Sequence, residues 1–156
     1  MDKRVRLVPL VIMVALVLLA TGHPSNAFAA SRTALEFFAR TPHGDASCAI
    51  YDGYGGLAEA FCESYRPGRE SKATVNAQGK VSICTSHNPR TDNCGLGNAG
   101  VNTPTFGYGH RITVGRFRCA VLHNGVMCTV ISSGKGFLFN PNRAVQVGAA
   151  SKQRTT

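Results

Sequence analysis

Tryptophan is absent from this chain, and it carries only four tyrosines and eight phenylalanines. With so few aromatic side chains, the order of the fold must come partly from another source. No acidic residue follows Asp92, which confines any paired-carboxylate chemistry to the first part of the chain. No apolar run of membrane-spanning length occurs after residue 29, so the predicted mature chain is not an integral membrane protein.

The usual sequence signatures of catalysis and of cofactor binding are also missing. No G-x-S-x-G and no D-x-D-x-D-G calcium loop occurs. Gly134-Lys135-Gly136 resembles a phosphate loop only superficially, because Thr129 stands where the motif needs glycine and a strand pattern follows where it needs a helix. We therefore predict no catalytic residue, no cofactor and no metal, and the sequence does not name an activity.

The first 29 residues have the pattern of a secretory leader. Lys3, Arg4 and Arg6 precede a run that is apolar from 7 to 20 apart from Pro9, and Ala27-Phe28-Ala29 offers a small-residue cleavage site. An uncleaved anchor is the alternative, but this run would reach only about 21 Å as a helix, short of the roughly 30 Å hydrocarbon core. We predict cleavage after Ala29 and secretion, a single β-rich domain over 30–148 and a disordered tail over 149–156.

Six cysteines follow the leader, an even number in a compartment that would be oxidising. They are Cys48, Cys62, Cys84, Cys94, Cys119 and Cys128. Their spacing favours neighbour pairs, 48–62, 84–94 and 119–128, among the fifteen pairings that are possible. Each bridge would stabilise the fold by about 2–4 kcal/mol, mainly by restricting the unfolded chain. Zinc is the alternative, and no two cysteines have the C-x2-4-C spacing that it prefers.

Alternation of apolar and polar residues predicts strands over most of the rest. The segment 116–122 places Phe117, Cys119 and Val121 on one face, and 126–131 alternates in the same way. A hairpin around Asn124-Gly125 is predicted, and a four-residue loop over 122–125 is preferred because it sets Cys119 opposite Cys128. Leu57 to Tyr65 permits helical turns, although a strand better returns Cys62 to Cys48.

Further strands are expected at 35–40, 47–51, 73–75, 80–85, 111–114, 137–139 and 144–147, and a long irregular segment at 86–109. The predicted fold class is all-β and mainly antiparallel: a small disulfide-stapled sandwich or barrel-like domain after the leader.

Several short motifs in the second half resemble one family of small exported actinobacterial proteins, catalogued as a domain of unknown function. They are Gly107-Tyr108-Gly109, Gly115-Arg116-Phe117-Arg118-Cys119, Gly125-Val126-Met127-Cys128 and Gly134-Lys135-Gly136-Phe137. Upstream, the segment 38–48 resembles the family's F-x-x-P-S-G-N-I-x-C motif, with His43 where serine is expected. Lys135 replaces the histidine of the family's G-H-G-F motif. The resemblance implies a secreted β-rich domain and no activity.

The excess of positive over negative charge in the predicted mature chain lies entirely in the part from residue 93 onward. Residues 31–92 contain seven basic and seven acidic residues, whereas residues from 93 onward contain seven basic residues and no acidic one. The candidate anion-binding residues are Arg111, Arg116, Arg118, Lys135 and Arg143. Alternation places the first three on outward strand positions and the other two in adjoining turns. They suit an anionic polymer or a cell-envelope surface, although a solvated face of a soluble protein has the same composition.

The leading hypothesis is therefore a non-enzymatic binding protein that acts by surface contact. A small secreted hydrolase is one alternative: His110, His123 and Lys135 are the candidates for a ribonuclease-like site of two imidazoles and a cation. A protease inhibitor that presents the stapled loop 86–94 is another. Tyr51, Tyr54 and Tyr108 are candidates for a stacking platform, although loop tyrosines more often serve local packing.

Overall fold

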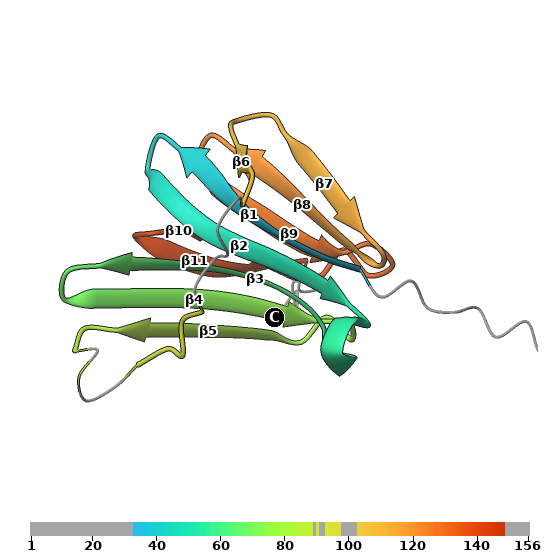
Figure 1. Cartoon of the computed structure of the whole chain (residues 1–156), viewed down its shortest axis with the longest axis horizontal. Coiled ribbons are helices and arrows are strands. Elements are labelled where there is room, and N and C mark those ends of the chain that lie inside the picture. The colour runs from blue at the N-terminus through green and yellow to red at the C-terminus, as the bar shows by residue number, and fades with distance from the viewer. Residues whose placement is uncertain (1–32, 89, 91–92, 98–102, 149–156) are drawn as a thin grey trace, which may run out of the picture.

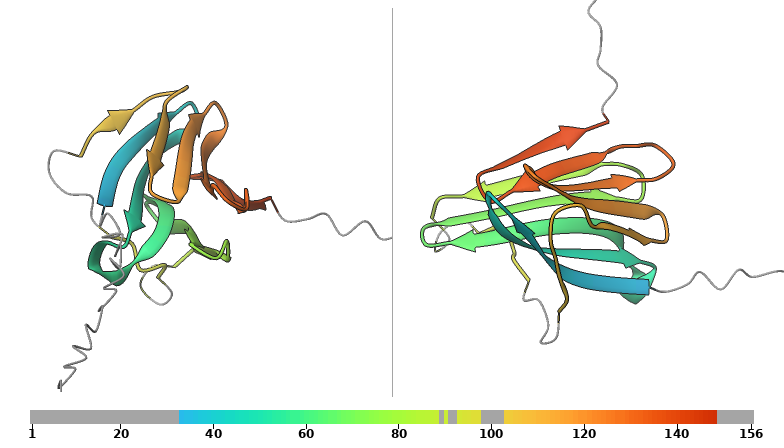
Figure 2. Two further views of the ribbon diagram at one scale, coloured as in Figure 1. Left: turned by 90° about the vertical axis from the view of Figure 1, so that its right-hand side faces the viewer. Right: turned by 90° about the horizontal axis from the view of Figure 1, so that it is seen from above.

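Two stacked β-sheets make up the part of the chain that the computed structural model describes, which is residues 33–88, 90, 93–97 and 103–148 (Figures 1 and 2). In chain order the strands are β1 Thr33–Thr41, β2 Gly44–Asp52, β3 Ala58–Arg66, β4 Arg69–Asn76, β5 Val81–Ser86, β6 Thr105–Phe106, β7 Arg111–Val114, β8 Phe117–Leu122, β9 Gly125–Val130, β10 Gly136–Asn140 and β11 Arg143–Val147. A 3-10 turn over Tyr54–Gly56 joins β2 to β3. The predicted leader and the predicted tail lie outside the described residues.

Each sheet is an antiparallel meander, so neighbours in sequence are neighbours in space. The first sheet, sheet A, has the order β5-β4-β3-β2-β1-β6, and the second, sheet B, has the order β11-β10-β9-β8-β7. The two-residue β6 is the exception, because it pairs parallel with β1 and not with β5, the strand that precedes it in the chain. The all-β, mainly antiparallel prediction is confirmed, and the architecture is a sandwich.

The hydrophobic core lies between the two sheets and follows the alternation that the sequence shows. Phe37 and Ala39 of β1 are fully buried, and Leu35 packs against the same cluster, as predicted for this strand. From sheet B, Phe117, Phe137 and Phe139 are among the largest fully buried side chains. The other buried residues of the core cluster are alanines, valines, isoleucines and four cysteines.

All three neighbour disulfides are present. Cys48–Cys62 and Cys119–Cys128 each join residues directly opposite one another on adjacent strands, with Cα atoms 4.1 Å apart. Both pairs are buried in the core. Cys84–Cys94 instead ties β5 to the segment that follows it. The strand interpretation of the ambiguous segment around Cys62 is thereby confirmed, because β3 covers it from Ala58 to Arg66.

The hairpin between β8 and β9 has the predicted register but a shorter turn. Cys119 lies opposite Cys128 and Val121 opposite Val126, as expected, yet Leu122 also pairs with Gly125 and leaves a two-residue turn at His123-Asn124. The four-residue loop was therefore wrong. Gly125 belongs to β9, where it pairs with Leu122, and a Cβ atom there would overlap the carbonyl oxygen of Phe139 on β10. Both this close approach and its φ of 145° favour glycine at this position.

Two arginines tie the sheets together at the end that carries this turn. Arg66 donates to Asn142 Oδ1 at 2.9 Å and to the carbonyl of His43 at 3.1 Å, and Arg69 donates to the carbonyl of Asn142 at 2.9 Å. Because both guanidinium groups make these contacts within the fold, neither arginine is counted among the cations available to a binding partner. No helix among the described residues is long and apolar enough to cross a membrane.

Candidate functional site

Three of the five candidate anion-binding residues lie on one surface, the outer face of sheet B. Arg111 begins β7, Arg118 lies in β8 and Arg143 begins β11, and all three are exposed. Their side chains form no hydrogen bond or ion pair with any described residue. In the other half, Arg40 pairs with Asp45 and Lys72 pairs with Glu63, whereas the exposed side chains of Lys80 and Arg90 also form no hydrogen bond or ion pair with a described residue. Uncommitted arginines are therefore concentrated on sheet B.

Arg116 does not belong to this group, and its predicted strand position was wrong. It occupies the two-residue turn between β7 and β8, since Val114 already pairs with Phe117. Its Nε lies 2.8 Å from Asp52 Oδ1 in an ion pair without hydrogen-bonding alignment, and its backbone N–H donates to Oδ2 at 3.0 Å. The preceding Gly115 has φ of 51°, and a Cβ there would overlap the Asp52 carboxylate. Arg116 thus ties the sheets together at this turn.

Lys135 lies outside the strands, at the end of sheet B where Arg118 also lies, because Arg118 pairs with Thr129 and Thr129 pairs with Gly136. It precedes β10, and Val130 donates its backbone N–H to the Lys135 carbonyl at 2.9 Å, which places the residue at the far end of β9 from His123. The length of β9 separates those two ends by about 17 Å. The structure therefore does not bring Lys135 together with His123, as a ribonuclease-like site of these residues would require.

The two histidines of that hypothesis lie in an exposed aromatic cluster at the other end. The ring of His123 meets the rings of Tyr108 and His43 edge-on, with centroids 6.2 and 6.3 Å away. His110 stacks on Phe106 at 5.4 Å, and its Nδ1 lies 3.1 Å from the carbonyl of Gly107. Both histidines are at the surface, in strand-connecting segments. These contacts are local aromatic packing, and Lys135, the cation of the hypothesis, lies at the other end of β9.

An apolar row across sheet B was not expected from the sequence. On its outer face Ala120, Met127, Leu138 and Val145 come from β8, β9, β10 and β11, and successive members of the row are direct cross-strand partners. We call these four residues the apolar stripe. None of them belongs to the core cluster, and all but Ala120 are partly exposed. A solvated sheet face normally carries polar residues at such positions.

The three arginines border this stripe on three sides. Arg111 is the cross-strand partner of Ala120 and so ends the stripe at β7. Arg118 lies two residues before Ala120 on β8, and Arg143 lies two residues before Val145 on β11. Beside Arg143 is a hollow of about 220 Å³, lined by Leu138 and Val145 on its apolar side and by Asn124, Asn140 and Arg143 on its polar side.

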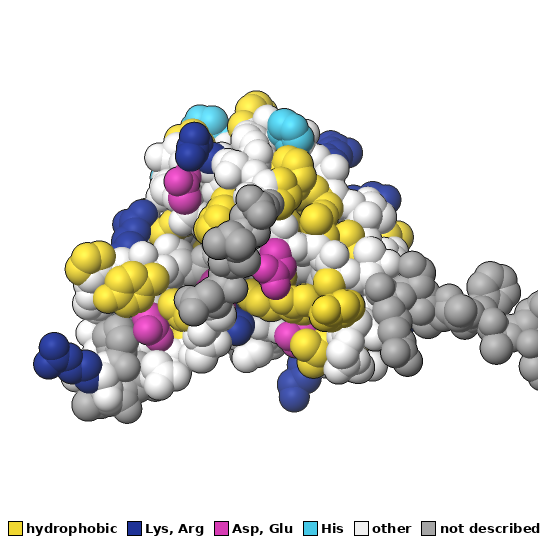
Figure 3. Space-filling view, in the orientation of Figure 1, with side chains coloured by type: hydrophobic (Ala, Val, Ile, Leu, Met, Phe, Trp, Pro, Cys, Tyr) yellow, Lys and Arg dark blue, Asp and Glu magenta, His cyan; other side chains and the backbone are white. Residues whose placement is uncertain are grey.

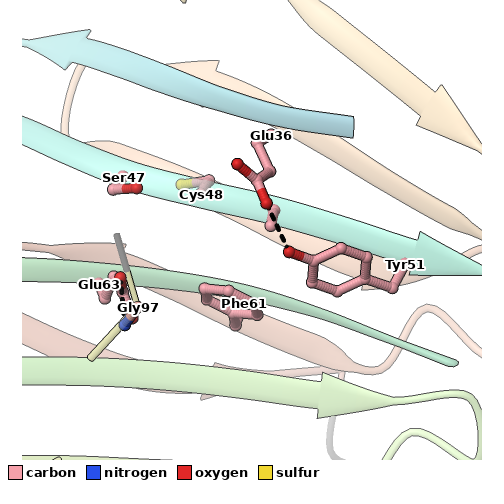
Figure 4. Close-up of a pocket in the computed structure, with 8 residues that line it drawn as sticks. Glu36, Ser47, Cys48, Tyr51, Phe61, Glu63 and Gly97 are labelled. Carbon is pink, nitrogen blue, oxygen red and sulfur yellow. Dashed lines mark hydrogen bonds between the residues drawn. The ribbon is translucent and has the colours of Figure 1, made fainter. Parts of the chain in front are cut away.

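The outer face of sheet A has a different character, in which hydrophobic and acidic side chains lie together (Figure 3). The rings of Tyr51 and Tyr54 stack with centroids 6.2 Å apart, and Phe61 lies 6.0 Å from Tyr51. Tyr51 and Tyr54 of the suggested stacking platform are thus together, whereas Tyr108 is at the histidine end. A small pocket of about 40 Å³ lies beside the rings, and Glu36, Glu63 and Gly97 help to line it (Figure 4).

A strap formed by residues 93–97 crosses this face and closes one side of the pocket. The buried carboxylate of Glu63 accepts the backbone N–H of Gly97 at 2.9 and 3.1 Å and lies 3.5 Å from Lys72 Nζ. Lys72 in turn donates to the carbonyl of Gly95 at 2.9 Å and lies 4.5 Å from the centre of the Phe61 ring. Together with Cys84–Cys94, these contacts hold the strap on sheet A. Most of the loop 86–94 is described, but positions 89, 91 and 92 of the inhibitor hypothesis lie outside the described residues.

The ionisation of the Tyr51 phenol provides a measurable test of the contacts on this face. Burial and then the hydrogen bond from its hydroxyl to Glu36 Oε1, 2.7 Å long, raise the pKa of Tyr51 to about 12, with the charge of Glu36 acting in the same direction. We expect an absorbance titration at the phenolate band to show an ionisation near pH 12 that disappears in Tyr51→Phe. Because the folded pKa lies above the ordinary value near 10, this group's contribution to stability is complete below pH 10 and is lost as the pH rises toward 12. An unchanged titration in the variant would contradict the assignment.

The described residues contain no group of three or more histidine, cysteine or acidic side chains arranged to hold a metal ion. No family model matches the sequence, and no curated protein and no solved structure matches it. The resemblance to the exported actinobacterial family therefore stays a prediction, and the geometry alone directs the proposal that follows.

Sequence reasoning found the arginines of sheet B and missed the stripe between them. A signal was present, since Val126-Met127-Cys128 and Phe137-Leu138-Phe139 are apolar at both parities and so apolar on both faces of their strands. The register that aligns these residues across four strands is not visible in any one segment.

Proposed function

We propose that this protein is an exported, disulfide-stabilised binding protein without enzymatic activity, which contacts an anionic partner through the outer face of sheet B. The partner class is an anionic polymer or a cell-envelope surface. One observation carries the proposal: Arg111, Arg118 and Arg143 share this face, uncommitted to any described residue, and no acidic residue occurs after Asp92 to neutralise them.

Electrostatics makes such a face effective even without a deep pocket. Guanidinium groups are weakly hydrated and present forked donors that match phosphate and carboxylate oxygens. A surface with cations of one sign also attracts an anionic partner over about a Debye length, near 8 Å at physiological salt. The three disulfides fit an extracytoplasmic protein, because such bridges persist in oxidising compartments.

The proposal is tested by binding of a single-stranded oligo(dT), used as a simple polyanion. If three phosphates are engaged, raising the salt from about 0.05 to 0.15 M should lower the affinity roughly tenfold. The triple variant Arg111→Gln/Arg118→Gln/Arg143→Gln should bind weakly at both salt concentrations and lose most of the salt dependence. Fluorescence anisotropy of labelled oligonucleotide measures both quantities.

A matched control removes three exposed cations from elsewhere. Arg40→Gln/Lys80→Gln/Arg90→Gln changes the net charge equally but leaves sheet B untouched, so it should retain most of the affinity. Equal losses in the two triple variants would mean that total charge, and not this face, determines binding. Absence of salt-sensitive binding in the wild-type protein would overturn the proposal itself.

A further inference from the structure

We propose that the partner of this face is an anionic lipid surface, against which the apolar stripe enters the interfacial region while the bordering arginines bind lipid phosphates. The inference rests on the proposed function and names its partner class. Its evidence is the combination of two features on one sheet face: arginines on three sides, and between them the apolar stripe, of which Met127, Leu138 and Val145 are partly exposed.

The stripe has no explanation in the fold itself. Ala120, Met127, Leu138 and Val145 point away from the core, which the opposite faces of the same strands already fill with Val121, Val126, Cys128, Phe137 and Phe139. Leu122 on β8 and Val147 on β11 add partly exposed apolar surface on the same face. At about 4.8 Å between strands, a stripe across four strands spans roughly 14 Å. Apolar surface of this kind, rimmed by polar residues, marks an interaction site.

The arrangement fits an interface between water and lipid better than it fits a soluble polyanion. A polyanion such as a nucleic acid binds through cations and stacks its bases on aromatic rings, yet the stripe consists of aliphatic side chains and methionine. An anionic leaflet offers both parts: phosphates for Arg111, Arg118 and Arg143 at the rim, and the acyl boundary for Met127, Leu138 and Val145 in the middle. Long arginine side chains reach phosphates while the stripe goes deeper.

The hollow beside Arg143 supports the same partner. Its walls are amphipathic, with Leu138 and Val145 on one side and Arg143, Asn124 and Asn140 on the other. The polar side is held in place, because Asn140 donates to the carbonyl of Asn124 at 2.9 Å and accepts the backbone N–H of Arg143 at 2.9 Å. At about 220 Å³ the hollow is smaller than a typical drug-sized pocket, but it can take part of an amphiphile whose remainder lies in the leaflet.

Tryptophan substitution supplies a direct probe, since the chain contains none. In Leu138→Trp the new indole should move to an apolar environment on vesicles that contain phosphatidylglycerol, with a blue shift in emission and quenching by nitroxide-labelled acyl chains. Leu57→Trp is the matched control, because Leu57 is 46% exposed and lies at the end of sheet A. Its emission should change little, and vesicles of phosphatidylcholine alone should shift neither.

The contributions of charge and apolar surface are then separated by partition measurements. Each arginine replaced by glutamine should lower partitioning onto anionic vesicles about fivefold. Leu138→Gln should lower it about tenfold and leave oligo(dT) binding unchanged, whereas Leu57→Gln should change neither. Circular dichroism of each variant before the assay confirms that the fold is retained, and the Leu138→Trp probe stays informative if Leu138→Gln does not fold.

The outcomes distinguish this inference from the proposed function. Binding to oligo(dT) with no binding to anionic vesicles, or vesicle binding that Leu138→Gln does not weaken, would leave a polyanion-binding face and overturn the lipid inference alone. Loss of both kinds of binding in the wild-type protein would overturn the proposed function as well. Capture of an acidic protein without any vesicle binding would likewise replace lipid as the partner.

Discussion

Replacement of either core disulfide by two alanines should lower the free energy of unfolding by about 4 kcal/mol. Each bridge closes a short loop, with sequence separations of 14 for Cys48–Cys62 and 9 for Cys119–Cys128, and loop closure alone accounts for roughly 3 kcal/mol in either case. The sulfur atoms also fill the space between the sheets, where these four cysteines are at most 1% exposed. The alanine pair leaves a cavity there, which adds to the loss.

The third bridge is an internal control for this estimate. Cys84–Cys94 has a sequence separation of 10, so its loop-closure contribution is nearly the same, but both residues are only partly buried and hold the strap and not the core. Cys84→Ala/Cys94→Ala should therefore lose about 1 kcal/mol less than the core variants. Urea unfolding followed by circular dichroism measures all three double variants. Equal losses would show that the buried sulfurs contribute nothing beyond the chain constraint.

The same cysteines show why much of this fold could be predicted from the sequence. Two of the bridges join direct cross-strand partners in hairpins, so sequence proximity and spatial proximity coincide, and spacing alone selected the right pairing from fifteen. Strands such as Arg111–Val114 were found at their observed bounds, because alternation reflects burial on one face of a sheet. A meander topology makes local signals sufficient for most of the chain.

Features that depend on contacts between distant segments could not be predicted in this way. Gly125 lies inside β9 against Phe139 of the next strand, a contact with no local signature, and the predicted four-residue loop over 122–125 was wrong. Arg116 and its partner Asp52 are 64 residues apart in the sequence, so no local pattern predicts their interaction. Neither the strap over Phe61 nor the alignment of the stripe could be obtained without knowing which strands are neighbours.

Only part of the candidate surface could be predicted from the sequence, because the rest depends on contacts between distant segments. The charge asymmetry is a property of composition, so Arg111, Arg118 and Arg143 could be named before their positions were known. The pairing of Arg116 with Asp52 and the distance of Lys135 from His123 are properties of the fold, because they depend on which segments are neighbours. The outer face of sheet A thus holds the paired Glu63 and Lys72, whereas Arg111, Arg118 and Arg143 on the outer face of sheet B are exposed to solvent.

The Glu63–Lys72 pair on sheet A should show a marked asymmetry between its two partners. The side chain of Glu63 is 4% exposed, whereas that of Lys72 is 22% exposed. Lys72→Leu leaves the carboxylate buried with only the Gly97 N–H as a partner, and we expect a loss of about 3 kcal/mol in the free energy of unfolding. Glu63→Leu should cost about half as much, because the flexible lysine can carry its ammonium group into water.

A double-mutant cycle measures the coupling energy between Glu63 and Lys72 and so tests this expectation. Glu63→Leu/Lys72→Leu removes both charges and should recover most of the stability that Lys72→Leu loses, giving a coupling of about 1–2 kcal/mol in urea unfolding. Lys80→Leu, at an exposed position directly before β5 of the same sheet, is the matched control and should have little effect. In every variant without Glu63 the Gly97 amide loses its acceptor, so its hydrogen exchange should accelerate even where global stability recovers. Additive losses with unchanged exchange at Gly97 would mean that the disulfide alone holds the strap in place.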